Sequence, residues 1–229
     1  MKHWIRITVL LLALAILSGC TLPFDHNHNE NNQKTASTEA TTQPASAADS
    51  AGYSAVDKDI LQLLNSGSTE GNYTYITIGM KEVVAPIKSV TDRYSSISYA
   101  LEDINDDSNP EMIVLDSMDN TRILAVFTLK NDAPTLIDEG WNRSRLYRLS
   151  DGSRYSEGSG GAAYSTFSFD AELWFTYPKN SDQTEIGFYY SADGTYDPAA
   201  AQEITTEEYH AKKTELTKKI SPFSVYHFS

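Results

Sequence analysis

Hydrophobic residues follow two kinds of pattern along the chain. At 55–65 they recur every three to four positions and share one face, while charged residues occupy the other face. This period predicts an amphipathic helix. Gly67 follows directly and is placed to end the helix as a C-terminal cap. From Ile97 onward the apolar positions instead form short runs between polar turns, which predicts an antiparallel β meander.

Strands are predicted in a pair within 98–116 and then at 122–129, 134–138, 145–149, 163–169, 173–177 and 186–190. Residues 73–78 are β-branched and aromatic, which predicts one more strand, ahead of the meander. Residues 80–87 predict a second helix, whose length Pro86 limits. A C-terminal helix is expected at 206–220, because the Thr-Thr-Glu-Glu run resembles a capping arrangement. A helix, a long antiparallel sheet and a closing helix together predict an α+β fold.

The first residues carry a separate signal. Lys2 and Arg6 precede an apolar run at 7–17, which as a helix would rise only about 16 Å, far less than a bilayer core. The run therefore predicts a secretory signal and not a permanent membrane span.

The apolar run ends in Leu17-Ser18-Gly19-Cys20, and Cys20 is the single cysteine of the chain. The segment resembles a bacterial lipobox, where a peptidase cuts before a cysteine that carries a diacylglyceryl group. The resemblance implies a lipid anchor at Cys20, palmitate or similar acyl chains, and a place on the extracytoplasmic face of the cell membrane. Two acyl chains hold a protein stably, whereas one binds only reversibly.

Three regions follow from these patterns. Residues 1–19 are the expected lipoprotein signal peptide, 20–52 a disordered tether, and 53–229 a single α+β domain. The tether is predicted because this stretch is rich in Ser, Thr, Ala, Asn and Gln and cannot bury enough apolar surface to offset chain entropy. Such tethers resemble those of Gram-positive surface lipoproteins.

The formal net charge of −13 repels nucleic acid and anionic lipid headgroups, so no nucleic-acid partner is expected.

An oxygen-rich turn lies between the first two predicted strands of the meander. Its candidate ligands for a hard cation are Asp103, Asn105, Asp107, Asn109 and Glu111. Calcium takes six to eight oxygens from carboxylates and carbonyls, and alternating side chains supply them at short intervals. The helix-loop-helix calcium motif fails here, because Ser108 and Val114 stand at the places of its Gly and Glu.

The turn is similar to the strand–loop–strand calcium box of FG-GAP and VCBS repeats. Asp103, Asn105, Asp107 and Glu111 match its ligand positions, whereas Ser108 replaces the usual Gly. The resemblance implies a structural calcium ion. The alternative is a solvated hairpin in which Asp and Asn cap backbone amides. Because the chain has no second copy, a propeller is excluded.

Aromatic residues suggest a binding surface. Trp141 lies beside Arg143 and Arg145, and arginine and tryptophan recur at binding hot spots. These three are the candidate binding residues for a protein or glycan ligand. The expected function is a lipid-anchored binding module. The alternatives are a secreted hydrolase of cell envelope or glycan, and an accessory lipoprotein of a membrane or export complex.

Overall fold

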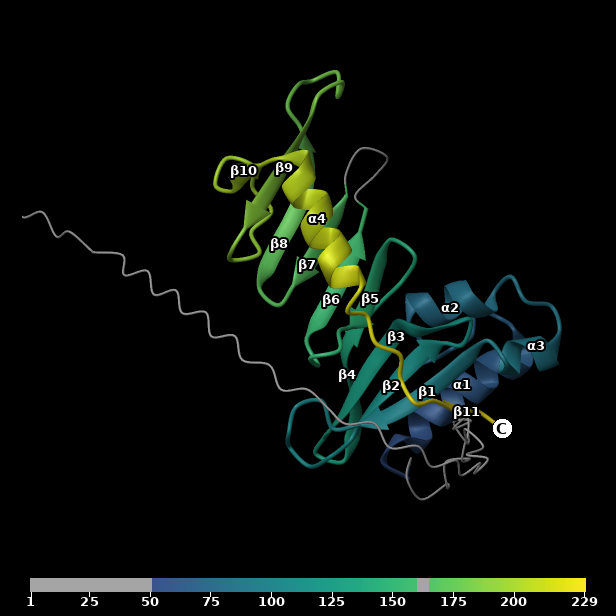
Figure 1. The fold of residues 1–229 in the computed structure, drawn as a ribbon. Coiled ribbons are helices and arrows are strands. Elements are labelled where there is room, and N and C mark those ends of the chain that lie inside the picture. Colours follow the sequence, from purple (N-terminus) through teal and green to yellow (C-terminus); the bar gives the residue numbers. More distant parts are fainter. Residues whose placement is uncertain (1–50, 160–164) are drawn as a thin grey trace, which may run out of the picture. The chain divides into compact units, whose positions relative to one another are not determined.

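The computed structural model describes residues 51–159 and 165–229. Within these residues the chain forms one antiparallel sheet of eleven strands with a few helices, which confirms the predicted α+β fold (Figure 1). The expected signal peptide, the lipidation site Cys20 and nearly all of the expected tether lie outside the described residues. No helix in the described part is long and apolar enough to cross a membrane.

Five helical segments are present in the described residues. They are the 3-10 turn η1 (Ala51–Tyr53) and the helices α1 (Ser54–Ser66), α2 (Ile78–Val84), α3 (Val90–Tyr94) and α4 (Thr206–Thr217). The predicted first helix is confirmed, and Gly67 ends it in the left-handed conformation at φ 65°. The predicted capping arrangement of the last helix is also confirmed, because the Thr205 side chain and Glu208 form a reciprocal capping box.

The strands are β1 (Ile97–Glu102), β2 (Glu111–Asp116), β3 (Asp119–Lys130), β4 (Ala133–Glu139), β5 (Ser144–Arg148), β6 (Arg154–Gly158), β7 (Thr166–Phe169), β8 (Glu172–Pro178), β9 (Ile186–Ser191), β10 (Gln202–Ile204) and β11 (Tyr226–His227). Their order is β10-β9-β8-β7-β6-β5-β3-β2-β1-β11. Strand β3 pairs with β5 near its beginning and with β4 along its second half. The sheet is therefore a meander in which one long strand has two partners on the same side.

One expectation differs from the structure, and several short elements were not predicted. The predicted strand at 73–78 was wrong, because 73–77 is irregular and Thr77 accepts a hydrogen bond from the Met80 amide as the N-cap of α2. A hydroxyl at that position satisfies an amide that the helix leaves unpaired, and this favours a cap over a strand. The strands β6, β10 and β11 and the short helix α3 were not predicted, since each has too few apolar positions to show a period.

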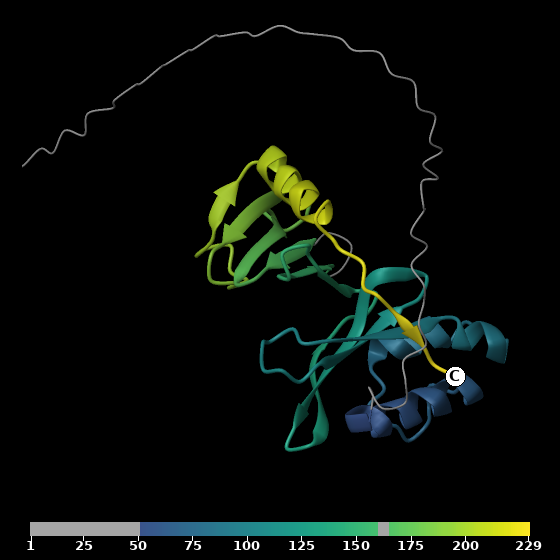
Figure 2. The same cartoon turned by 60° about the horizontal axis from the view of Figure 1, so that its bottom comes forward.

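Buried side chains form three clusters. The first packs α1 and α2 against β1–β3, and the second lies on the other sheet face, where Phe223 of the C-terminal segment packs. The third is largely aromatic and joins Tyr209 and Leu216 of α4 to the strands β5–β7. Both views show α4 lying along the later strands and the C-terminal segment continuing toward β1 (Figure 2).

All three clusters are built from residues between Tyr53 and Phe228. The described residues also belong to one compact unit that begins at Thr41. A chain that starts at Thr41 therefore contains every residue of these three clusters, and we expect it to fold on its own.

Candidate functional site

The oxygen-rich turn is held by hydrogen bonds from its own backbone. Asp103 accepts from the amides of Asp107 (3.2 Å) and Ser108 (2.8 Å), and Asn105 Oδ1 accepts from the Asp107 amide at 2.9 Å. Asp107 Oδ1 accepts in turn from the amide of Asn109. Ser108 has φ 69°, where the related motif has Gly, and this conformation costs a serine about 1 kcal/mol.

Glu111 differs from the other candidate ligands because it is fully buried. Its carboxylate accepts from the Ile104 amide (3.0 Å), from Asn105 Nδ2 (3.0 Å) and from the Thr128 hydroxyl (2.8 Å). The neighbouring Tyr53 hydroxyl donates to the Pro110 carbonyl at 2.9 Å. Burial, and then the charge of Glu111, raise the pKa of Tyr53 to about 12.

These contacts are those of a capped hairpin. Among the described residues no group of three or more His, Cys, Asp or Glu side chains is arranged to hold a metal ion. The oxygens of Asp103, Asn105 and Glu111 are close together but are used as acceptors for N–H and O–H donors. Calcium at these positions therefore stays a prediction from the sequence.

A second feature is a hollow of about 460 Å³ that we call the tyrosine hollow. It is lined by Arg143, Ser144, Ser156, Gly158, Ser159, Thr166, Tyr177 and Tyr196. Tyr177 and Tyr196 are 38% and 46% exposed, respectively. The lining thus combines two accessible aromatic rings with hydroxyl groups and one guanidinium.

Tyr196 is fixed in place by the loop that carries it. Its ring packs 4.5 Å from the ring of Phe175 and meets Tyr177 edge-on at 6.2 Å. Asp193 accepts from the Ser191 hydroxyl and from the Thr195 amide, and these bonds lower the pKa of Asp193. These side-chain caps hold the turn, and the ring contacts hold Tyr196 against Phe175.

Arg143 is presented by a two-residue turn between β4 and β5. Trp141 and Ser144 close the turn by exchanging two backbone hydrogen bonds, of 2.8 and 3.1 Å. Within the turn, the Asn142 amide donates to Glu82 of α2 at 2.7 Å, and Asn142 Oδ1 accepts from Arg122 of β3 at 2.9 Å.

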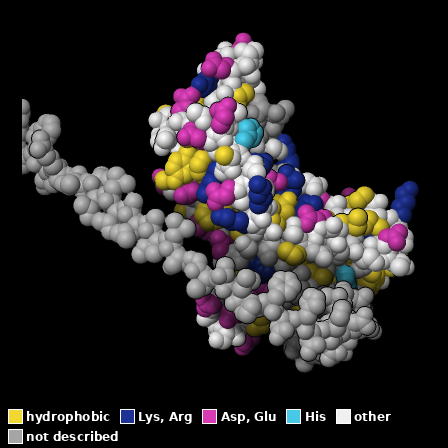
Figure 3. Space-filling view, viewed as in Figure 1, with side chains coloured by type: hydrophobic (Ala, Val, Ile, Leu, Met, Phe, Trp, Pro, Cys, Tyr) yellow, Lys and Arg dark blue, Asp and Glu magenta, His cyan; other side chains and the backbone are white. Residues whose placement is uncertain are grey.

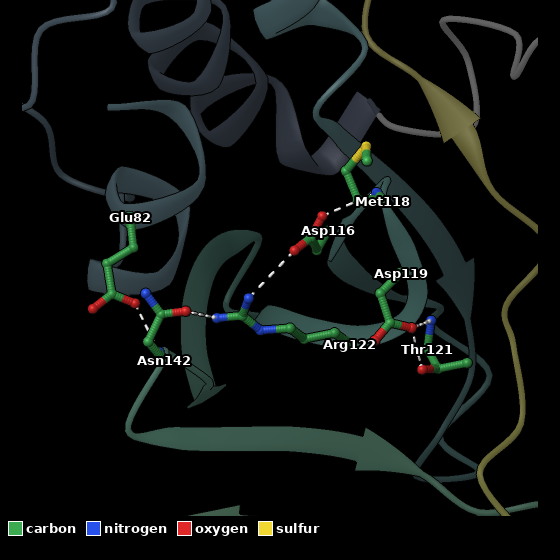
Figure 4. A network of polar contacts seen from close by, with 7 residues as sticks. All are labelled: Glu82, Asp116, Met118, Asp119, Thr121, Arg122 and Asn142. Carbon is green, nitrogen blue, oxygen red and sulfur yellow. Dashed lines mark hydrogen bonds and ion pairs between the residues drawn. The ribbon is translucent and has the colours of Figure 1, made fainter. Parts of the chain in front are cut away.

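Figure 4 shows this polar network continuing from Arg122 to Asp116, which lies 3.3 Å away. Gly79 and Gly140 bring α2 against the same turn. A Cβ added to Gly79 would lie 2.0 Å from the Gly140 carbonyl oxygen. Glycine has no Cβ and so allows this close approach. The turn that carries Arg143 is therefore fixed to both a helix and a strand.

The structure separates the candidate binding residues predicted from the sequence. Arg143 lines the tyrosine hollow, whereas Trp141 is half-buried and is not part of its lining. Arg145 lies on the opposite face of β5 from Ser144, because successive side chains of a strand alternate. It pairs there with Glu157 at 2.6 Å, and Glu157 also pairs with Lys213 of α4 at 3.1 Å.

Sequence reasoning missed Tyr177 and Tyr196, which belong to two separate segments of the chain. Tyr177 lies in a predicted strand with an alternating pattern, and that alternation could have placed it on the same face as Phe175. Tyr196 lies in a loop of the type Asp-Gly-Thr-Tyr-Asp, for which no pattern predicts a contact with β8.

The face of the molecule seen in Figure 3 is mixed in charge despite the acidic composition. Figure 3 shows acidic, basic and hydrophobic side chains interspersed, with basic ones gathered near the end of α4. Within the described residues, Arg143 has no ion-pair partner, unlike Arg145, Arg148 and Arg154. Its guanidinium donors are thus available at the hollow.

Comparisons of the chain with protein-family models, with curated proteins and with solved structures gave no match.

Proposed function

We propose that the protein is a lipid-anchored surface protein on the extracytoplasmic face of the cell membrane and that its folded domain is a binding module. The anchor is supported by the resemblance of residues 17–20 to a lipobox and by Cys20 being the single cysteine. Two acyl chains on that thiol would hold the domain at the membrane through the residues that precede it.

The observation that carries the binding function is the tyrosine hollow. Tyrosine rings offer large, rigid contact area with a polar tip, and arginine supplies several donors in a planar group. Together with the hydroxyls of Ser156 and Thr166, they match a ligand that has flat apolar faces and many hydroxyl groups. A glycan of the cell envelope has this chemistry, and we take it as the ligand class.

The lining supports binding over hydrolysis. Glycoside hydrolysis uses two carboxyl groups on either side of the scissile bond, about 5 to 9 Å apart. The described lining of the tyrosine hollow contains hydroxyl, aromatic and guanidinium groups and no carboxyl group. The net charge of −13 likewise favours a ligand other than nucleic acid.

The test is a pulldown with a soluble chain that starts at Thr41, applied to cell-envelope polysaccharide and to secreted fractions. It is run with and without chelator, and with Tyr196→Ala and Met118→Ala variants. Met118 is 89% exposed and lies outside the hollow, so its variant is the matched control. We expect retention of an envelope glycan that Tyr196→Ala loses and Met118→Ala keeps. Equal retention by both variants, or no retained glycan, would contradict the proposal.

A further inference from the structure

A second concavity lies beside the tyrosine hollow. We call it the apolar groove; its cavity volume is about 270 Å³. Its floor is formed by the aliphatic side chains of Ile113, Ile123, Val126 and Leu146, each at most 6% exposed. Ile104 and Ile137 stand at its mouth and are 47% and 43% exposed. Exposed isoleucines beside an apolar floor mark a place that gains stability when an apolar group covers it.

The groove and the hollow lie on the same face of two neighbouring strands. On β5, Ser144 lines the hollow, and Leu146, two residues later, lines the groove. On β6, Arg154 lines the groove and Ser156 lines the hollow. Residues two apart in a strand share a face and lie about 7 Å from each other.

Leu146 and Ser156 are also direct partners in the β5–β6 pairing. The floor of the groove therefore meets the floor of the hollow with no strand between them.

Two ion pairs border the groove without placing an unpaired charge in it. Arg148 pairs with Glu102 of β1, and its guanidinium carbon lies 3.9 Å from the centre of the Phe223 ring. Arg154 pairs with Asp138 of β4. Arg148 and Arg154 face each other across β5 and β6, where like charges repel unless each has a partner. Because each arginine has its own carboxylate, the groove offers an apolar interior with a neutralised rim.

The hollow offers the opposite chemistry at the other end of the same surface. Arg143 has no ion-pair partner among the described residues, and Tyr177 and Tyr196 are accessible beside hydroxyl groups. One ligand that satisfies both ends has a hydroxylated head and an aliphatic tail. A glycan without a tail would leave the groove unfilled, and a simple hydrocarbon would leave the polar lining without partners.

We propose that the apolar groove and the tyrosine hollow form one site for a glycolipid, with its sugar in the hollow and the first part of its acyl or alkyl chain in the groove. The proposal rests on the proposed function, since it uses the same hollow for the sugar. It adds the amphiphilic class of the ligand.

The size of the expected effect follows from burial of the chain. Each methylene that leaves water contributes enough to raise affinity about fourfold. The groove has a volume of about 270 Å³, so the gain should level off once the chain fills it. A series of ligands with one sugar and increasing chain length therefore measures the contribution of the groove to affinity separately from that of the sugar.

The experiment titrates the soluble chain from Thr41 with methyl, hexyl and octyl maltoside below their micelle concentrations, using calorimetry. The groove variant is the double substitution Ile104→Ser and Ile137→Ser, at exposed positions where the core is left intact. The hollow variant is Tyr196→Ala, and Met118→Ala is the matched surface control. Circular dichroism and thermal unfolding confirm that every variant is folded.

We expect octyl maltoside to bind at least tenfold more tightly than methyl maltoside, following the gain per methylene. The groove variant should lose most of that gain, and Tyr196→Ala should weaken all maltosides by about tenfold, as for a contact residue of a hot spot. Met118→Ala should behave as the parent chain.

Three results would overturn the inference: no binding of octyl maltoside, affinity that does not change with chain length, or a chain-length effect that the groove variant retains. Equal affinity of Tyr196→Ala and the parent chain for every maltoside would also overturn it, because the sugar would then not lie in the hollow. If the envelope pulldown still depends on Tyr196 while octyl maltoside fails to bind, the proposed function stands and only the glycolipid class is rejected.

Discussion

The strands β2 and β9 show how differently the two parts of the sheet are covered. Every residue of β2 is buried, whereas β9 alternates between buried and partly exposed positions. Strand β2 has α1 and α2 on one face and Phe223 on the other. In β9 the buried residues Gly187, Tyr189 and Ser191 lie on the face where Tyr189 stacks on Phe175, whereas Phe188 on the other face packs on Tyr209 of α4 and is partly exposed. An antiparallel strand with both faces fully covered shows no such alternation.

The two parts also differ in the chemistry of their cores. The first is mainly aliphatic, and α1 contributes four buried residues to it. The third cluster is mainly aromatic, and α4 contributes two. Large rings fill space with few side chains, so α4 alone packs on one face, while on the opposite face Tyr196 packs on the buried Phe175 and stays 46% exposed. In the proposed function, the early strands provide the larger aliphatic core and the later strands carry the tyrosine hollow.

The largest expected loss of stability comes from removing one buried ring from each core. Phe127→Ala in the aliphatic core and Phe167→Ala in the aromatic core each remove a ring that is at most 1% exposed. Each should lower the free energy of unfolding by about 3–5 kcal/mol. Urea unfolding followed by fluorescence and by circular dichroism measures this loss. Because β3 and β5 join the two parts in one sheet, we expect a single transition in both variants. A separate early transition in Phe167→Ala alone would show that the two parts unfold independently.

Removing a buried cation from the aliphatic part should have the next largest effect. Arg93 is 5% exposed and donates to the carbonyls of Leu64, Asn65, Ile87 and Lys88. These acceptors include the end of α1, where the helix dipole favours positive charge. Arg93→Ala leaves buried carbonyls unpaired and should cost about 3 kcal/mol. Arg143→Ala, at an exposed position, is the matched control and should cost less than about 0.5 kcal/mol. Equal losses in both variants would contradict this assignment.

A calcium titration distinguishes the two interpretations of the oxygen-rich turn, a calcium site and a capped hairpin. If the ion binds, millimolar calcium should raise the melting temperature, because a ligand of the native state alone stabilises it by up to about 2.7 kcal/mol at a hundred times its Kd. Asp103→Ala should remove that rise. If the turn is a capped hairpin, calcium has no effect, and Asp103→Ala costs about 1 kcal/mol through its two lost amide bonds. Asp132→Ala, in another exposed turn, serves as the control.

Alkaline pH should lower the stability of the folded protein, because Tyr53 in the aliphatic core loses its proton. Its pKa is raised from 10 to about 12 in the folded protein, so its protonated form is favoured there. That contribution to stability is complete below pH 10 and is lost as the pH rises through 10 to 12. Melting temperatures should therefore fall across this window. Tyr53→Phe should show a smaller fall, because its ring has no proton to lose. An identical fall in both proteins would assign the effect to other tyrosines.

Much of the fold was predictable from periodicity, because the amphipathic face of α1 and the apolar runs of the early strands are strong local signals. The misassigned stretch at 73–78 has strand composition, yet the hydroxyl of Thr77 begins α2 instead. The turn at 103–111 was located correctly, but the orientation of its oxygens depends on the folded backbone.

The tyrosine hollow was predictable only in part. Arg143 was named from its neighbours, whereas Tyr177 and Tyr196 meet through the packing of a loop on β8. Contacts between residues far apart in the chain leave no mark in a single sequence. Their positions depend on the caps of Asp193 and on the contact with Phe175.

The most direct test of the account is the affinity of the soluble chain from Thr41 for immobilised envelope glycan, compared between Tyr196→Ala and Met118→Ala at matched melting temperatures. The account predicts that Tyr196→Ala weakens binding about tenfold or more and that Met118→Ala leaves it unchanged. Equal affinity of the two variants would contradict the proposal that the tyrosine hollow binds the ligand.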